Sequence, residues 1–215
     1  MASTEMGSRR RPGHPYRVDP AFFEDAANFD VRYVPELDRI AEIVAALRSE
    51  DLRVVLTSGS FDILHEGHSM YLEAAKRMGD FLVVGVDSDD KIRKRKGPGR
   101  PAVPELERLR LVTHQRGVGM VTLKRSEHPH WALIKTVRPD VLVVTEDAYT
   151  DAEREELGRD YCGKVVVLPR MATVSTSARL RLLQLQVAER LSTEVSAQLP
   201  TLLRRITDEL MPPST

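Results

Sequence analysis

Short apolar runs alternate along most of the chain with segments whose apolar residues recur every three or four positions. The apolar runs predict buried parallel strands at residues 53–57, 81–86, 118–123, 141–144 and 164–168. The segments between them predict helices at residues 34–47, 67–78, 104–113, 131–137 and 151–160, and two more follow at 175–190 and 193–210. Strands that alternate with helices are typical of an α/β fold. We therefore predict a doubly wound, Rossmann-like parallel sheet with extra C-terminal helices.

Three regions follow from this pattern. Residues 1–33 are polar and are expected to form an N-terminal tail. Residues 34–183 hold the α/β pattern, and residues 184–215 are expected to form a C-terminal helical extension. Within the α/β region, residues 87–104 are basic and contain several glycines and prolines, which predicts a long loop.

Composition excludes some classes of protein. The chain has 32 Lys and Arg against 32 Asp and Glu, and this zero net charge argues against a dedicated nucleic-acid binder. A single cysteine, Cys162, allows no intramolecular disulfide, so a cytoplasmic setting is expected. Apolar runs stay well short of the roughly 18 to 20 residues of a membrane span, so no membrane partner is expected.

The first candidate site directly follows the first predicted strand. Its residues are Gly59, Ser60, Phe61, Asp62, His65, Gly67 and His68. His65 and His68 are three positions apart, so they share a face if a helix begins there, and a helix N-terminus favours phosphate. An imidazole there can donate to a phosphate oxygen and stabilise charge that develops as pyrophosphate leaves. The alternatives are two surface histidines or a zinc pair, but zinc would need further ligands that the sequence does not offer, so no metal site is predicted.

Two more candidate sites follow later strands. Six basic residues crowd the segment 91–100, which by itself would favour a nuclear signal or a nucleic-acid patch. Its place after a strand instead favours a cationic loop that closes over a triphosphate. After the last strand, Ser175, Thr176 and Ser177 open a helix, where a hydroxyl is often only an N-cap.

Together the three segments resemble, in order, the motifs of the cytidylyltransferase-like nucleotidyltransferases. The shared features are the HxGH element, Lys96-Gly97 followed by Arg100-Pro101 and a downstream Arg108, and a Ser-Thr-Ser turn. The resemblance covers roughly residues 39–183. It looks strongest toward the heptose-1-phosphate adenylyltransferase domain of the bifunctional heptose kinase/adenylyltransferases.

The resemblance assigns roles to these residues. It implies that His65 and His68 contact the NTP phosphates and that Asp62 supports the loop. Lys96 is expected to touch phosphate, and the Ser175–Ser177 turn to hold the β- and γ-phosphates. Arg100 and Arg108 are expected to bind phosphate or to anchor loops, whereas Lys91, Arg93, Lys94 and Arg95 are expected to form a solvated face.

One segment departs from the family pattern. After the fourth strand the family often has Gly-Asp or Lys-Gly-Gly-Asp-Tyr, but this chain has Thr145-Glu146-Asp147-Ala148-Tyr149. The changed shape and charge point to a different acceptor. Further candidates for the acceptor or base pocket are Asp87, Glu146, Asp147 and Tyr149. No kinase-like segment precedes the α/β pattern, so a stand-alone transferase is expected.

The expected activity is therefore nucleotidyl transfer from an NTP, ATP before CTP, to a small phosphorylated acceptor such as a sugar 1-phosphate. The resemblance implies Mg²⁺, bound mainly through the NTP phosphates, and a homodimer. Alternatives are a glycerol-3-phosphate or phosphonate cytidylyltransferase, an FMN adenylyltransferase and a fragment of a class I aminoacyl-tRNA synthetase. A non-enzymatic nucleotide sensor or nucleic-acid binder is the alternative outside these enzyme classes.

Overall fold

The computed structural model describes residues 18–169, 171 and 176–210. The chain divides after residue 172 into two units. The first unit contains the sheet with its covering helices, and the second contains one long helix.

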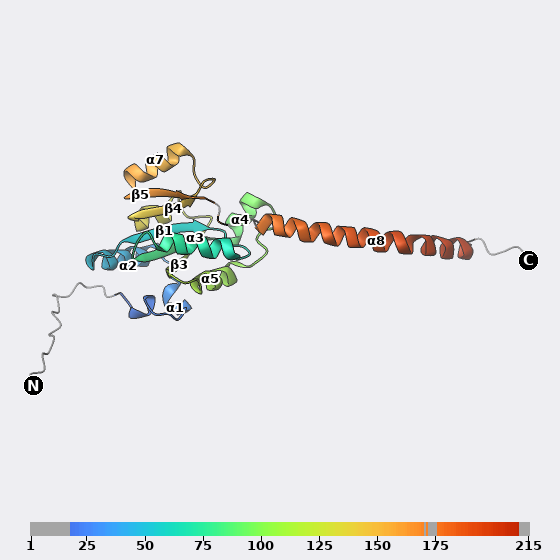
Figure 1. Ribbon diagram of the computed structural model, residues 1–215, viewed down its shortest axis with the longest axis horizontal. Helices are drawn as coiled ribbons and strands as arrows, with labels where there is room; N and C mark the ends of the chain where they lie inside the picture. The colour runs from blue at the N-terminus through green and yellow to red at the C-terminus, as the bar shows by residue number, and fades with distance from the viewer. Residues whose placement is uncertain (1–17, 170, 172–175, 211–215) are drawn as a thin grey trace, which may run out of the picture. The chain divides into compact units, whose positions relative to one another are not determined.

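Five parallel strands form the centre of the first unit (Figure 1). They are β1 (Val54–Gly59), β2 (Phe81–Asp87), β3 (Val118–Lys124), β4 (Val141–Thr145) and β5 (Lys164–Leu168). Their order is β3-β2-β1-β4-β5, and each neighbouring pair is parallel. Val, Leu and Phe fill β1 and β2 because both faces of these central strands are covered. The predicted doubly wound α/β fold is confirmed.

Helices cover both faces of this sheet. Side chains of α2 (Leu37–Ser49), α6 (Ala132–Val137) and α7 (Asp151–Asp160) pack in one core cluster, with Leu56 of β1 among its strand residues. Side chains of α3 (Glu66–Lys76) and α5 (Glu105–Thr113) pack in the other, with Val55 of β1. Successive residues of a strand point to opposite faces, so each strand contributes to both cores.

The strand order places a topological switch point beside β1. The chain runs from β1 to β2 and on to β3 in one direction, and then crosses to β4 on the other side of β1. Ligands of open α/β sheets bind at such a switch point, outside the carboxyl ends of the strands. The turn after β1 and the loop after β4 flank this point.

Residues 20–33 differ from the polar tail that the sequence predicts. They form a 3-10 helix, η1 (Pro20–Phe22), and a short helix, α1 (Phe29–Arg32). The Phe22 ring is buried and meets the ring of Phe81 edge to face, with centroids 5.9 Å apart. Three phenylalanines in this stretch provide apolar area that a solvated tail would leave in water, and burial of such area stabilises the packed form.

Residues 89–96 also differ from their prediction, because they form a helix and not a loop. This is α4 (Asp89–Lys96), and Ser88 caps its N-terminus by accepting a hydrogen bond from the Lys91 amide. Asp89 and Asp90 lie in the first turn and four basic residues in the last, an order that suits the helix dipole. The charges that indicated a loop are those that stabilise both ends of the helix.

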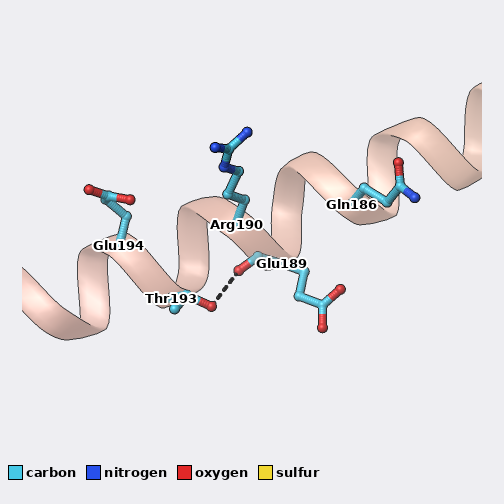
Figure 2. A pocket seen from close by; sticks show the side chains of 5 residues that line it. All are labelled: Gln186, Glu189, Arg190, Thr193 and Glu194. Carbon is cyan, nitrogen blue, oxygen red and sulfur yellow. Dashed lines mark hydrogen bonds between the residues drawn. The ribbon is translucent and has the colours of Figure 1, made fainter.

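The second unit is a single helix, α8 (Thr176–Leu210), where the sequence predicts two. The break expected near residue 192 is absent, and Thr193 donates its hydroxyl proton to the carbonyl of Glu189 within the continuous helix. A pocket on α8 is lined by five side chains, which Figure 2 shows: Gln186, Glu189, Arg190, Thr193 and Glu194. All five residues come from one helix, so no second element encloses the pocket and we do not regard it as a ligand site. No helix in the described part of the chain has both the length and the apolar character to cross a membrane.

Candidate active site

A strained turn carries the two histidines from β1 into α3. Phe61 has φ 47°, a left-handed conformation that is rare for an aromatic residue and occurs preferentially at functional sites. Its ring is buried and lies 5.5 Å from the ring of His68. His65 is the N-cap residue of α3 and accepts a backbone hydrogen bond from His68 at 2.9 Å. The turn therefore places both imidazoles at a helix N-terminus, where unpaired backbone N–H groups favour an anion.

The two imidazoles stack on each other, with ring centroids 3.9 Å apart and planes inclined by 28°. Burial, and to a smaller extent the neighbouring His65 and Lys96, together lower the pKa of His68 from 6.5 to about 4, against an opposing effect of Asp62. His68 is therefore neutral at pH 7 and has one N–H to donate. Its buried Nδ1 has no hydrogen-bond partner among the described residues, which is typical of a side chain that binds a ligand.

Asp62 fastens a second loop to this turn. Its side chain is only 2% exposed, and its Oδ1 accepts hydrogen bonds from the amides of Ala102 and Val103 at 2.7 and 3.0 Å. Its Oδ2 lies 2.8 Å from Nη2 of Arg100. Asp62 thus fixes the segment that contains Arg100, Ala102 and Val103 to the histidine turn. Arg100 is in contact with this carboxylate and contributes less charge to the site than a free arginine would.

Arg108 is completely buried, and its guanidinium links the segments that follow β1 and β2. It donates to the carbonyl oxygens of Val103, Ser60 and Asp87 at 2.8, 2.5 and 2.8 Å. It also forms an ion pair of 2.6 Å with Asp89. Of the two roles considered for this residue, phosphate binding and loop anchoring, the geometry favours loop anchoring.

Lys96 ends α4 close to the histidines. It lies near enough to His68 to lower the pKa of that imidazole. Partial burial lowers the pKa of Lys96 itself, as do Arg95 and Arg100, while Asp62 and Asp87 oppose the shift. A lysine whose charge is disfavoured by neighbouring cations gains from an incoming anion. Among the described residues, His65, His68 and Lys96 therefore form a cationic and hydrogen-bonding surface suited to phosphate.

A second polar cluster lies at the carboxyl ends of β1, β2 and β3. Asp87, only 2% exposed, has Oδ2 2.9 Å from Nη2 of Arg95 and Oδ1 3.4 Å from Nζ of Lys124. Lys124 also donates to Oγ of Ser58 at 2.9 Å, and Arg95 to Oγ of Ser60 at 2.9 Å. Arg95, which the sequence analysis expects on a solvated face, has a side chain that is 52% exposed and that also contacts Asp87.

Lys124 belongs to this polar cluster, and the sequence analysis does not identify it. The predicted strand ends at residue 123, whereas β3 extends to Lys124 and pairs it in register with Asp87. The missed signal was a charged residue directly after an apolar strand, at the edge where ligands bind. Burial by itself would raise the pKa of Asp87, but Lys124, Arg95 and Lys91 outweigh burial, so the net pKa lies below its usual value.

Of the candidates after β4, Tyr149 joins this cluster. Burial raises the pKa of its phenol to about 12, with further contributions from Asp87 and Glu153, and its hydroxyl shares a hydrogen bond with Ser58. Glu146 and Asp147 are exposed in the loop. Ser175 lies outside the described residues, and so do the side chains of Thr176 and Ser177 at the start of α8.

Binding of Mg²⁺ mainly through phosphate stays a prediction from the family resemblance. Within residues 18–169, 171 and 176–210, no group of three or more His, Cys, Asp or Glu could hold a metal ion. The two buried carboxylates nearest the histidines, Asp62 and Asp87, both contact cationic side chains. Mg²⁺ commonly keeps several water molecules and binds through substrate phosphates with few protein ligands.

Comparison with known proteins agrees with this geometry. The family model described as cytidylyltransferase-like matches residues 56–195, more than half of the chain. The chain belongs to the cytidylyltransferase-like family. The matched region contains every candidate site residue from Gly59 to Ser177, and the resemblance inferred from the motifs is confirmed.

Curated relatives of this family member include several proteins named bifunctional protein HldE. The one from Desulfatibacillum aliphaticivorans is 34% identical over 151 residues, which cover 68% of this chain and 31% of the relative. The one from Trichlorobacter lovleyi is 39% identical over 140 residues, which cover 64% of this chain and 28% of the relative. The chain thus corresponds to about a third of the length of these relatives.

A solved structure shows the same fold. It is a lipopolysaccharide core biosynthesis protein from Thermoplasma volcanium, 30% identical in sequence. The superposition has a TM-score of 0.50 and covers 55% of this chain and 98% of that protein.

We expect nucleotide binding to raise the pKa of His68 above its free value of about 4, because phosphate oxygens stabilise the protonated imidazole. A bound pKa above the free pKa means that binding takes up a proton. Nucleotide affinity should therefore increase as the pH falls from the bound pKa toward 4. NMR titration of the histidine rings, with and without a non-hydrolysable NTP, measures both values. An imidazole that titrates near 6.5 in both states would contradict the assignment.

Proposed function

We propose that this chain transfers a nucleoside monophosphate from an NTP to a small phosphorylated acceptor and releases pyrophosphate. The observation that carries the proposal is the stacked pair of His65 and His68 at the N-terminus of α3, with Lys96 beside it. These groups offer hydrogen-bond donors and positive charge at the switch point of the sheet. Membership of the cytidylyltransferase-like family supports the same reaction.

In the proposed reaction an oxygen of the acceptor phosphate attacks the α-phosphorus of the NTP in line with the leaving group. A bond forms between that oxygen and the α-phosphorus, and the bond from the α-phosphorus to the bridging oxygen breaks as pyrophosphate departs. The acceptor oxygen is already ionised at pH 7, so the reaction needs no general base. Catalysis then consists mainly of positioning and of stabilising charge.

The side chains at the site have different roles in this reaction. His65 and His68 donate hydrogen bonds to the phosphates, and Lys96 neutralises the charge that develops on pyrophosphate. The Ser175–Ser177 turn would add hydroxyl and amide donors. Mg²⁺, held mainly through phosphate oxygens, would supply further charge neutralisation. Asp62 and Arg108 act indirectly, because they hold the loops that carry these groups.

For the nucleotide we favour ATP, with CTP next, and for the acceptor a sugar 1-phosphate. The support is the resemblance to the heptose-1-phosphate adenylyltransferases and the similarity to proteins named HldE. A glycerol-3-phosphate or phosphonate cytidylyltransferase and an FMN adenylyltransferase are the alternatives. Action in the cytoplasm, without a nucleic-acid partner, is part of the same proposal.

Substitution of His68 tests the assignment directly. We expect His68→Ala to lower kcat about 100- to 1,000-fold, the usual loss when one donor to developing charge is removed. The measurement is pyrophosphate release with the nucleotide and acceptor that support turnover. His114→Ala is the matched control, because His114 is exposed at the end of α5 and should leave the rate unchanged. A nearly normal rate in His68→Ala would contradict the role proposed for this residue.

A homodimer formed through α8 is also part of the proposal. One row of apolar residues runs along α8 with spacings of three, four and four, and comprises Ala188, Leu191, Val195, Leu199, Leu202 and Ile206. The large apolar side chains of this row are exposed, Leu191 by 60% and Leu202 by 50%. A repeat of eleven residues is the pattern of helices that pair with a slight right-handed supercoil. A second copy of α8 would cover this row.

Charge introduced into the row should prevent this pairing. We expect Leu191→Glu combined with Leu202→Glu to convert a dimer into a monomer in sedimentation equilibrium, because two charges would be buried without partners. Gln186→Glu is the control, since it adds a charge on the opposite side of α8. A dimer that survives the double substitution, or a wild-type monomer, would contradict the proposal.

A further inference from the structure

The second polar cluster lies on a different face of the sheet from α3. Strand alternation places Ser58, Asp87 and Lys124 on the face that α2 and α6 cover, since Ser58 is two residues beyond Leu56 of that core. Lys124 lies across Gly85, where an added Cβ would come within 2.7 Å of the lysine Cδ. The same Cβ would approach Leu133 of α6 to 2.6 Å. Gly85 thus leaves the space in which the lysine reaches Asp87.

This cluster combines hydrogen-bond donors with acceptors, unlike a phosphate site. Phosphate is bound by donors, as at His65, His68 and Lys96, whereas a buried carboxylate repels it. Here the Asp87 carboxylate, the Lys124 ammonium and the hydroxyls of Ser58 and Tyr149 meet. Each hydroxyl of a sugar both donates and accepts, so a mixed set of this kind suits a polyhydroxylated carbon skeleton.

Two buried oxygens in this region lack a hydrogen-bond partner among the described residues. They are Oδ1 of Asp87 and Oγ1 of Thr122, and the two residues are 2% and 1% exposed. Lys124 Nζ lies 3.4 Å from the Asp87 oxygen, an ion-pair distance that is longer than a good hydrogen bond. A buried carboxylate oxygen without a hydrogen bond is costly, and a ligand hydroxyl would relieve that cost.

We propose that Asp87, Lys124 and Tyr149 bind the hydroxyl groups of the acceptor and thereby select a polyhydroxylated phosphate ester over a simple alkyl phosphate. This inference rests on the proposed nucleotidyl transfer. The acceptor phosphate then lies toward His65, His68 and Lys96, and its carbon skeleton extends along the strand ends toward β3. Arg95 lies between the two regions, because it donates to Asp87 and to Ser60, which belongs to the turn that leads to the histidines.

Calorimetry on the protein with bound nucleotide tests this selection. The nucleotide is an NTP with a methylene group between the α- and β-phosphorus, with Mg²⁺. The titrants are mannose 1-phosphate, a heptose 1-phosphate, glycerol 3-phosphate and ethyl phosphate, which has the ester phosphate but no hydroxyl. We expect at least one hydroxylated ester to bind about 10- to 100-fold more tightly than ethyl phosphate, as hydrogen bonds to charged groups provide.

Substitutions show which residues cause the preference. In Asp87→Asn and in Lys124→Met, the affinity for the best hydroxylated ester should fall toward the affinity for ethyl phosphate. The Kd for the nucleotide should stay within about twofold of the wild-type value. Tyr149→Phe removes one hydroxyl, leaves the buried charges in place, and should lower the affinity for that ester by a smaller factor. If Asp87→Asn or Lys124→Met fails to fold, Tyr149→Phe still tests the proposal. Arg93→Gln is the control, because Arg93 is exposed on α4 and pairs only with Asp90 among the described residues.

The outcomes separate this inference from the proposed function. Equal affinity for ethyl phosphate and the hydroxylated esters would overturn the inference, and so would a preference that persists in folded Asp87→Asn, Lys124→Met and Tyr149→Phe. Failure of all the esters to bind the nucleotide-bound protein would overturn it as well. Absence of nucleotide binding, in contrast, would count against the proposed nucleotidyl transfer.

Discussion

The buried guanidinium of Arg108 holds the carboxyl edge of the sheet together. It donates to the carbonyl oxygens of Ser60 after β1 and Asp87 at the end of β2, and it pairs with Asp89 at the start of α4. A buried charge that loses its partners costs several kcal/mol. The segments that follow β1 and β2 must therefore keep their positions for the protein to remain folded. The histidine turn and the polar cluster around Asp87 are consequently held in one fixed relation.

The histidine turn and the cluster around Asp87 present polar groups of different chemistry. His65, His68 and Lys96 lie where donors and positive charge accumulate, and the low pKa of His68, about 4, reflects a ring that burial and nearby cations keep neutral. Asp87 and Lys124 instead form an ion pair in which the buried Asp87 carboxylate adds a hydrogen-bond acceptor. A transferase must bring two anionic substrates together, and the first set can reduce their repulsion. The second set can hold the part of an acceptor that carries no charge.

The sequence predicts the strands, the fold and the histidine turn because these features are local. An apolar run followed by Gly59 and two histidines three positions apart is visible without any contact map. Lys124 was missed because its role depends on pairing with Asp87 across two strands, which no local pattern reveals. The helix α4 was missed because its charges were counted without their order. Residues 20–33 were assigned to the tail because their aromatic side chains find partners such as Phe81 only in the folded chain.

The most direct test of the central claim is pyrophosphate release by the purified protein with Mg²⁺ and each of ATP, CTP, GTP and UTP. The acceptors would be sugar 1-phosphates, glycerol 3-phosphate, FMN and simple phosphonates. Nucleotidyl transfer predicts release that requires one nucleotide together with one acceptor, and a product that joins the two. A protein that neither binds an NTP in calorimetry nor releases pyrophosphate with any pair would contradict it.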